Sequence, residues 1–305
     1  MNLPHAHGAA VPITLGTAQL GIPYGLGAAA AGMDAADAEA LLQAAWDCGI
    51  RCLDTAPGYG SAERRIGCWM RATMARPTLV TKLPALGSVV ADDLLDVMQR
   101  SVDASCEALG CDVLDGLLLH KSADLVNPGV GAALLSLCDH GSISAFGASV
   151  YTVEDARTAL ALPGLRLLQI PGSLLNPSLF DAGIADDAAA AGVTLFVRSA
   201  FVQGLLLQSP ARLPRHLQAA SGVLAQLRQL AAEAGVGMAQ LALSAVAGRP
   251  GVSSLVLGFD TPDQLRESVA MLQRPSLDAE LVEAAFRIGR TAPPQIADPR
   301  FWKVG

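Results

Sequence analysis

The feature that most constrains the fold is a regular alternation of short aliphatic runs with longer stretches of helical spacing. The runs predict strands, near residues 12–16, 51–54, 78–82, 114–119, 143–147, 166–170, 193–198 and 253–257. The intervening and following stretches predict helices, at about 35–48, 61–74, 91–108, 129–140, 152–161, 179–191, 223–247, 261–272 and 277–290. Because parallel strands need crossovers of this kind, the alternation predicts an α/β fold.

Eight strand–helix units without a linker midway predict a closed (β/α)8 TIM barrel that occupies residues 1–305 as a single domain. A doubly wound open sheet would use the same local pattern. That fold usually carries GxGxxG after its first strand, but here the segment reads LGTAQLG, and its glycines are too far apart for that fingerprint. The barrel is therefore the preferred fold.

Residues at the predicted helix ends support these boundaries. Thr152 precedes Val-Glu-Asp in a capping-box arrangement, and Thr261 is followed by Pro262 at the first helical position. Gly110 and Gly192 each follow a helical stretch and precede a strand, where a left-handed residue commonly ends a helix.

Charge and composition exclude several classes of partner. A net charge of −7 argues against nucleic acid or an anionic membrane as the main partner. The six cysteines form no CxxC pair and no zinc spacing, so we expect no metal site, and buried, reduced thiols in a cytoplasmic protein. The first residues lack the pattern of a signal peptide. Nothing in the sequence specifies an oligomeric state.

Four ionisable residues lie at or just beyond the ends of three consecutive predicted strands. Asp54 ends the second strand, Tyr59 lies five residues further on, Lys82 ends the third strand, and His120 ends the fourth. In a barrel of this kind the catalytic groups lie at the carboxyl ends of the strands. Each residue alone has an ordinary structural interpretation, as a turn cap, a packing ring, a surface charge or a core histidine. Because all four lie at the same end of the predicted barrel, we favour a catalytic site.

Lys82 is unusual because the chain has only three lysines against 18 arginines. Reduction of a carbonyl by hydride requires a proton donor for the oxygen. A tyrosine, whose ordinary pKa is about 10, is protonated at neutral pH, and a nearby ammonium stabilises its phenolate. We therefore expect Tyr59 to be the acid, Lys82 and Asp54 the pair that tunes it, and His120 the group that orients the carbonyl.

These residues resemble the catalytic tetrad of the aldo-keto reductase family. The segment LDTAPGYGSAERRIG is similar to that family's second-strand motif, and the resemblance extends through GSISAFGASVYT, LLQIPGSLLN, FVRSAFVQGLL and LVLGFDTPDQLRES. It implies a (β/α)8 barrel with a nicotinamide cofactor extended across its carboxyl-end face, and a small-molecule carbonyl substrate.

The resemblance also implies contacts for the cofactor. Ser149 and Gln169 match residues that hold the nicotinamide carboxamide, and Ser199, Phe201 and Gly204 lie in a loop like the one over the pyrophosphate. The remaining candidate positions lie under the cofactor or at its adenosine end: Gly16, Thr17, Gly258, Phe259, Asp260, Gln264 and Ser268. Ser268 stands where an adenine-contacting asparagine is common in the family.

Arg198 and Asp260 also depart from the family pattern, and both bear on the choice of cofactor. Arg198 stands where many members have an aromatic residue on the nicotinamide; its charge would favour the neutral reduced ring. Asp260 stands where many members contact an adenosine 2′-phosphate, although Arg266 lies one helical turn further on. We expect NADP(H), with NAD(H) as the alternative.

The expected function is NAD(P)H-dependent reduction of a small aldehyde, ketone or sugar carbonyl. Tyr24 and Tyr151, with His120 and Tyr59, are expected to contact the substrate, and Phe201, Phe301 and Trp302 to lie within range of it. The alternatives are a sugar or alcohol dehydrogenase acting in the oxidative direction, a cofactor-binding subunit without catalysis, and an unrelated aldolase-type barrel with Lys82 as Schiff-base nucleophile. The four intact residues argue against a non-catalytic subunit.

Overall fold

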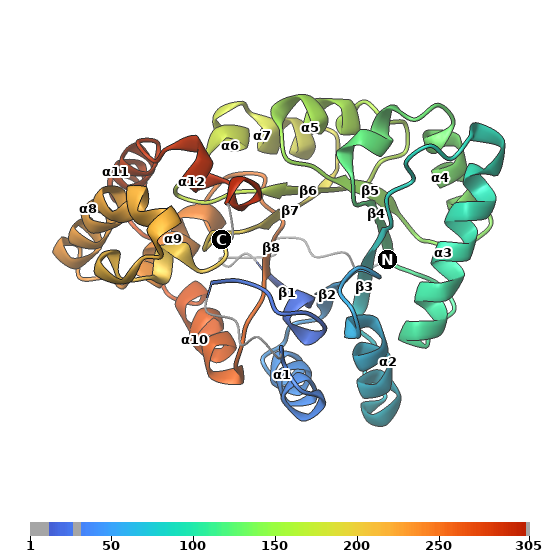
Figure 1. The fold of residues 1–305 in the computed structure, drawn as a ribbon, viewed down its shortest axis with the longest axis horizontal. Helices are drawn as coiled ribbons and strands as arrows, with labels where there is room; N and C mark the ends of the chain where they lie inside the picture. Colours follow the sequence, from blue (N-terminus) through green and yellow to red (C-terminus); the bar gives the residue numbers. More distant parts are fainter. Residues whose placement is uncertain (1–11, 27–31, 303–305) are drawn as a thin grey trace.

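A computed structural model describes residues 12–26 and 32–302 and contains a closed barrel of parallel strands in the order β1 to β8 (Figure 1). β8 pairs back with β1, with Thr14 opposite Val256. The strands are β1 Ile13–Gly16, β2 Cys52–Asp54, β3 Thr78–Leu83, β4 Gly116–Leu119, β5 Phe146–Ser149, β6 Leu167–Pro171, β7 Thr194–Arg198 and β8 Ser254–Leu257. The predicted TIM barrel is thus confirmed.

Helices surround the barrel, and Figure 1 shows α1 to α3 and α8 to α11 on its outer side. They are α1 Ala35–Asp47, α2 Ala62–Thr73, α3 Leu94–Leu109, α4 Val130–Asp139, α5 Val153–Leu160, α6 Ser178–Asp181, α7 Ile184–Ala190, α8 Ser221–Glu233, α9 Met238–Ala247, α10 Pro262–Leu272, α11 Ala279–Gly289 and α12 Pro294–Ala297. The expected caps are present, since Thr152 accepts from Asp155 N–H and Thr261 from Gln264 N–H.

Two of the stretches predicted as single helices each form two helices in the structure. The stretch 223–247 is divided into α8 and α9 by a turn in which Gly235 has φ +69°, and 179–191 is divided into α6 and α7 at Gly183, with φ +77°. A left-handed residue ends a helix. The apolar pattern continues across the first turn because Leu227 in α8 and Leu241 in α9 are buried in one hydrophobic cluster.

Strands β4 and β5 begin later than predicted. Leu114 and Ile143, the first residues of the predicted runs 114–119 and 143–147, form only an isolated parallel bridge with each other before the continuous strands begin. Both side chains are almost fully buried, so these residues are apolar because they belong to the core and not because they lie in a strand.

Inside the barrel, five of the strands have an apolar side chain followed two positions later by a polar one. Successive strand residues point to opposite faces, so residues two apart share a face. A small interior cluster includes Cys52, Val80, Leu118, Leu167 and Phe196. The residues two positions later are Asp54, Lys82, His120, Gln169 and Arg198. The inward polar layer therefore lies directly above an apolar floor, at the carboxyl ends of the strands.

The cysteines differ from the expected burial. All six are free, as expected, but only Cys52 is buried, four are half-buried, and Cys68 is exposed. Cys68 follows Gly67 on α2, whose sequence alternates charged and apolar residues at helical spacing, and the helix turns this thiol outward.

Among the described residues, no single helix is both long and apolar enough to cross a membrane. Only the segments Arg215–Glu233 and Met238–Ala247, taken together and bent by 90°, meet that criterion of length and composition.

Gly147 in β5 lies so close to the backbone of β6 that a substitution there tests the barrel packing. An alanine Cβ at Gly147 would lie 1.8 Å from the carbonyl oxygen of Leu167, so the backbone would have to move. We expect Gly147→Ala to lower the free energy of unfolding by about 3 kcal/mol, measured by urea denaturation. Gly222→Ala in α8, where no atom lies within 4 Å, is the control and is expected to be neutral or to stabilise by up to ~1 kcal/mol. Equal stability of both variants would contradict this packing.

Candidate active site

Lys82 and Asp54 form a buried ion pair at the carboxyl ends of β3 and β2. Lys82 Nζ lies 2.8 Å from Asp54 Oδ1 and 2.7 Å from Oδ2, and it donates a third bond to the carbonyl oxygen of Thr55 at 2.8 Å. Lys82 is 2% exposed and Asp54 4%. The three contacts match the three N–H donors of an ammonium group, so this side chain is held in one orientation.

Gln169 and Ser149 extend this network to β6 and β5. Gln169 Nε2 donates to Asp54 Oδ1 at 2.8 Å, and Ser149 Oγ donates to Gln169 Oε1 at 3.2 Å. Both side chains are buried. The structure thus connects Gln169 directly, and Ser149 through Gln169, to the carboxylate of Asp54.

The charge state of Lys82 follows from two opposing effects. Burial lowers the pKa of Lys82, but the negative charge of Asp54, together with Tyr59 and the hydrogen bonds, outweighs burial, and the pKa lies above its ordinary value. The ammonium therefore remains charged at neutral pH. Its Nζ lies 5.0 Å from the centroid of the Tyr59 ring, close enough to act on charge that develops on that ring.

His120 faces Tyr59 from the end of β4. The two ring centroids are 6.3 Å apart, with the ring planes at 88°. Burial, followed by the charges of Lys82 and Lys121, lowers the pKa of His120 to about 4. The imidazole is therefore neutral at pH 7 and has one nitrogen that donates and one that accepts. Asp54, Tyr59, Lys82 and His120 come together as the sequence predicts.

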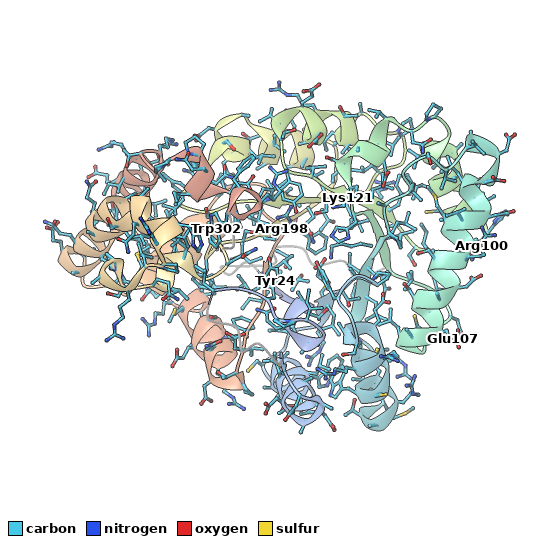
Figure 2. The ribbon with its side chains drawn as sticks, in the orientation of Figure 1. Tyr24, Arg100, Glu107, Lys121, Arg198 and Trp302 are labelled. Atoms are coloured by element: carbon cyan, nitrogen blue, oxygen red, sulfur yellow. The ribbon has the colours of Figure 1, made fainter. Side chains whose placement is uncertain are left out.

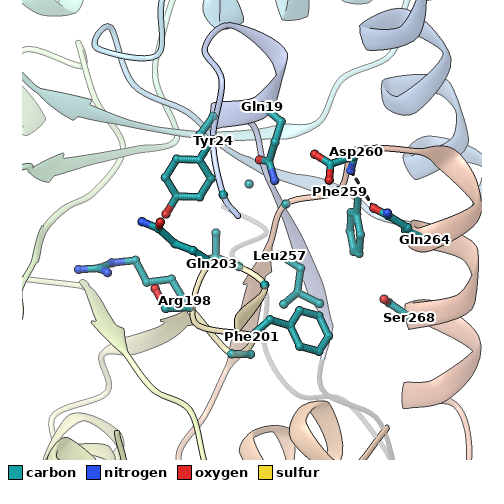
Figure 3. Close-up of a pocket in the computed structure, with 18 of the residues that line it drawn as sticks. Gln19, Tyr24, Arg198, Phe201, Gln203, Leu257, Phe259, Asp260, Gln264 and Ser268 are labelled. Carbon is teal, nitrogen blue, oxygen red and sulfur yellow. Dashed lines mark hydrogen bonds between the residues drawn. The ribbon is translucent and has the colours of Figure 1, made fainter. Parts of the chain in front are cut away.

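A cavity of 390 Å³ opens beside these residues (Figure 3). Asp54 and Tyr59 line it, and it continues past the end of β8 to α10. The expected cofactor contacts that also line it are Gly16, Thr17, Arg198, Ser199, Phe201, Gly204, Gly258, Phe259, Asp260, Gln264 and Ser268. An elongated cavity with hydrogen-bonding groups along its length fits an extended dinucleotide.

The loop after β7 borders this cavity with an unusual backbone. Ser199, Val202 and Gln203 have φ values of 66°, 50° and 52°, and Gly204 follows with 90°. Such angles are uncommon in residues other than glycine, above all in a β-branched one, and strain of this kind gathers at ligand-binding segments. Val202 is buried in the cluster beneath α8 and α9, which holds the loop in place.

Carboxylates gather where β8 leads into α10. Asp260 and Glu267 both line the cavity, and Gln264 Oε1 accepts from the backbone N–H of Asp260 at 2.9 Å, the dashed line in Figure 3. Burial raises the pKa of Asp260. Arg266 does not line the cavity: its Nη1 pairs with Asp263 at 2.8 Å, and both side chains are largely exposed.

Arg198 turns toward Tyr151. Its guanidinium carbon lies 4.2 Å from the centroid of the Tyr151 ring, and its Nη2 donates to the carbonyl oxygen of Val150 at 3.3 Å. Figure 2 shows Arg198 and Tyr24 over the middle of the barrel, whereas Arg100 and Glu107 lie on α3 at the rim. Tyr24 lines the large cavity; Tyr151 lines a second, smaller pocket instead.

Several residues near the site were not predicted from the sequence. Gln19, Gln203 and Glu267 line the large cavity, and each lies within two residues of a predicted contact or loop. Residues 298–300 line the small pocket, whereas Phe301 and Trp302, which were expected near the substrate, line neither pocket. Trp302 Nε1 instead donates to the carbonyl oxygen of Ile296.

Known proteins resemble this chain in sequence and in fold. Residues 12–287 match the model of the Aldo/keto reductase family. Pyridoxal 4-dehydrogenase from Microbacterium luteolum is 28% identical over 85% of this chain and 89% of its own length. D-threo-aldose 1-dehydrogenase from a Pseudomonas species is 30% identical over 81% and 88%. The solved holo structure of an aldo-keto reductase from Bacillus halodurans superposes with a TM-score of 0.75 at 19% identity, over 97% and 99% of the two chains.

The lowered pKa of His120 yields a prediction about acid stability. The folded protein binds a proton at His120 only near pH 4, whereas the unfolded chain binds it near the ordinary value of 6.5. Between these values the unfolded state holds more protons, so the free energy of unfolding falls as the pH falls from 6.5 to 4. We expect His120→Gln to lessen this fall, measured by urea denaturation across that range. The same substitution at exposed His140 is the control, and an unchanged slope in His120→Gln would refute the assignment.

Proposed function

Because the chain belongs to the Aldo/keto reductase family, we propose that it is an NAD(P)(H)-dependent oxidoreductase that reduces a small aldehyde, ketone or sugar carbonyl, with Tyr59 as proton donor. The observation that carries this proposal is the buried Lys82–Asp54 pair, with Lys82 Nζ 5.0 Å from the Tyr59 ring centroid. The nicotinamide supplies hydride to the carbonyl carbon when it is bound.

Tyr59 gives its hydroxyl proton to the carbonyl oxygen as that oxygen gains negative charge. The phenolate left behind is stabilised by the ammonium of Lys82. Lys82 can serve this role because Asp54 and the carbonyl oxygen of Thr55 fix its position and keep it charged. Asp54 in turn is held by Gln169.

His120 positions the carbonyl and does not compete for the proton. With a pKa near 4 it is neutral at pH 7, so it can donate one hydrogen bond to the substrate oxygen without adding a charge. A cationic imidazole beside Lys82 would place two like charges in one partly buried site, which is unfavourable.

A second candidate is oxidation of an alcohol or sugar by the same residues in reverse. The names of two relatives, pyridoxal 4-dehydrogenase and D-threo-aldose 1-dehydrogenase, favour this direction. The phenolate of Tyr59, stabilised by Lys82, would then accept the proton of the substrate hydroxyl.

The proton-donor role is tested by Tyr59→Phe, which keeps the ring and removes only the hydroxyl. We expect kcat to fall by about 10²- to 10⁴-fold, followed by NADH or NADPH consumption with a panel of small aldehydes. Cofactor binding, measured by calorimetry, should persist. Tyr24→Phe removes a hydroxyl from the same cavity and should cause a much smaller loss. Turnover that survives in Tyr59→Phe would exclude this mechanism.

The proposed cofactor is NAD(H), the alternative that the sequence left open beside NADP(H). Asp260 and Glu267 put two carboxylates at the α10 end of the cavity, and its lining there includes no lysine or arginine among the described residues. Arg266, the candidate partner for a 2′-phosphate, is engaged with Asp263 outside the cavity. A carboxylate repels a 2′-phosphate but accepts a hydrogen bond from a ribose hydroxyl.

We expect the KM for NADPH to exceed that for NADH by about tenfold or more, a factor that corresponds to ~1.4 kcal/mol. Asp260→Ser should reduce this ratio because it removes one of the two carboxylates that oppose a 2′-phosphate at the α10 end. The control is Asp92→Ser, which removes an exposed carboxylate that does not line the cavity. Preference for NADPH in the unaltered protein would contradict the assignment.

A further inference from the structure

A second pocket of 130 Å³ adjoins the large cavity. Tyr24, Arg198, Ser199 and Gln203 line both, so the two spaces share a wall above the barrel. The opposite wall of the small pocket comes from the segment after β6 and from residues 297–300. Its volume is well below that of a typical ligand site, so it has room for one substituent of a substrate that reacts in the large cavity.

Two arginines stack on one tyrosine at this pocket. The guanidinium carbon of Arg198 lies 4.2 Å from the centroid of the Tyr151 ring, and that of Arg300 lies 3.7 Å from it. The two cations are therefore no farther apart than the sum of these distances. Arg198 comes from the end of β7 and Arg300 from the 3-10 helix Pro299–Phe301. A planar ring thus brings together two positive charges from distant parts of the chain.

The carboxylate of Asp298 lies at the same pocket as Arg198 and Arg300. Asp298 accepts from Nε and Nη2 of Arg300. Burial of Asp298 opposes its ionisation, but these bonds and the charges of Arg300 and Arg198 hold its pKa below the ordinary value. The pocket lining therefore carries two positive charges and one negative charge.

Donor groups remain for a ligand. Among the described residues, Arg198 makes one hydrogen bond, from Nη2 to the carbonyl oxygen of Val150, which leaves Nε and Nη1 free. Arg300 uses Nε and Nη2 with Asp298, and its Nη1 has no protein partner in the described chain. Guanidinium groups with free N–H donors are suited to carboxylate and phosphate oxygens.

Among the described residues, no charged side chain other than Arg198, Asp298 and Arg300 lines this pocket. Lys82 and Asp54 cancel each other, and His120 is neutral at pH 7. The negative charge of Asp155 also acts on Arg300, but Asp155 does not line the pocket. A single anionic group in the pocket would balance the positive excess of its lining.

We propose that this pocket binds a carboxylate or phosphate group of the substrate, so that the preferred substrate is a small carbonyl compound with an anionic end. The inference rests on the proposed function for the reacting end of the substrate. Arg300 sets this specificity from outside the large cavity, since it lines the small pocket alone.

The test compares matched aldehydes with and without a negative charge. Succinic semialdehyde is paired with butanal, and glyceraldehyde 3-phosphate with glyceraldehyde, so that the two pairs distinguish carboxylate from phosphate. We expect kcat/KM to be higher for the anionic member of at least one pair. Arg300→Gln should lower the ratio of anionic to neutral kcat/KM by about tenfold, the range of one charge-assisted hydrogen bond, mainly through KM.

Two further variants guard against a general effect on folding or surface charge. Arg290→Gln is the matched control, because Arg290 also holds an aspartate with Nε and Nη2, but lines neither pocket. It should keep the ratio of the unaltered protein. Asp298→Asn removes the competing carboxylate and keeps a helix-capping side chain, so it should raise the ratio.

A direct measurement separates this inference from the proposed function. Butanoate, which has the carboxylate but no reacting carbonyl, and inorganic phosphate are titrated into each protein by calorimetry. We expect at least one of them to bind the unaltered protein about tenfold more tightly than Arg300→Gln. If neutral aldehydes are reduced but neither anionic preference nor anion binding depends on Arg300, the inference is overturned and the proposed function stands. If no aldehyde is reduced, the proposed function fails and the titration alone decides the anion site.

Discussion

The buried ion pair between Lys82 and Asp54 is the contact on which the rest of the site depends. Removing two charges from water is unfavourable by several kcal/mol per ion unless each is well paired. Here Asp54 accepts from Lys82 and Gln169, and Lys82 also donates to the carbonyl oxygen of Thr55. The pair thereby joins β2, β3 and β6 across the barrel opening. Loss of either partner would leave a buried charge unpaired. The stability of the barrel and the chemistry of the site are therefore linked.

The pleat of the strands explains how one barrel holds both a dry core and a polar site. Side chains two apart share the inward face, so Val80 and Lys82, or Leu167 and Gln169, lie one above the other. The lower residue of each pair belongs to the interior cluster, and the upper one faces the opening. The apolar layer keeps water away from the base of the polar layer, which strengthens the electrostatic effect of Lys82 on Tyr59.

The sequence predicted the features that depend on local pattern. The eight strands and the meeting of Asp54, Tyr59, Lys82 and His120 follow from periodicity and from the rule that barrel sites lie at the carboxyl ends of strands. The division of 223–247 at Gly235 was not predicted, because apolar residues on both sides of the turn are buried in one cluster.

The directions in which the long arginine side chains point could also not be predicted from the sequence. Arg266 was expected near the cofactor, but Asp263, three residues earlier on the same exposed helical face, engages it. Arg198 turns to Tyr151, and Arg300 reaches the same ring from a segment that pattern and spacing left unassigned. Such contacts are decided by which partners the tertiary fold brings within reach, not by spacing along the chain.

The position of residues 297–300 has a consequence for how such a protein can change over time. These residues follow the last large helix, α11, and contribute no strand to the barrel. Substitutions there can alter the wall of the small pocket while the strand registers and the buried ion pair stay the same. The proposed substrate-selecting part of the molecule is thus free to vary separately from the part proposed to carry out the reaction.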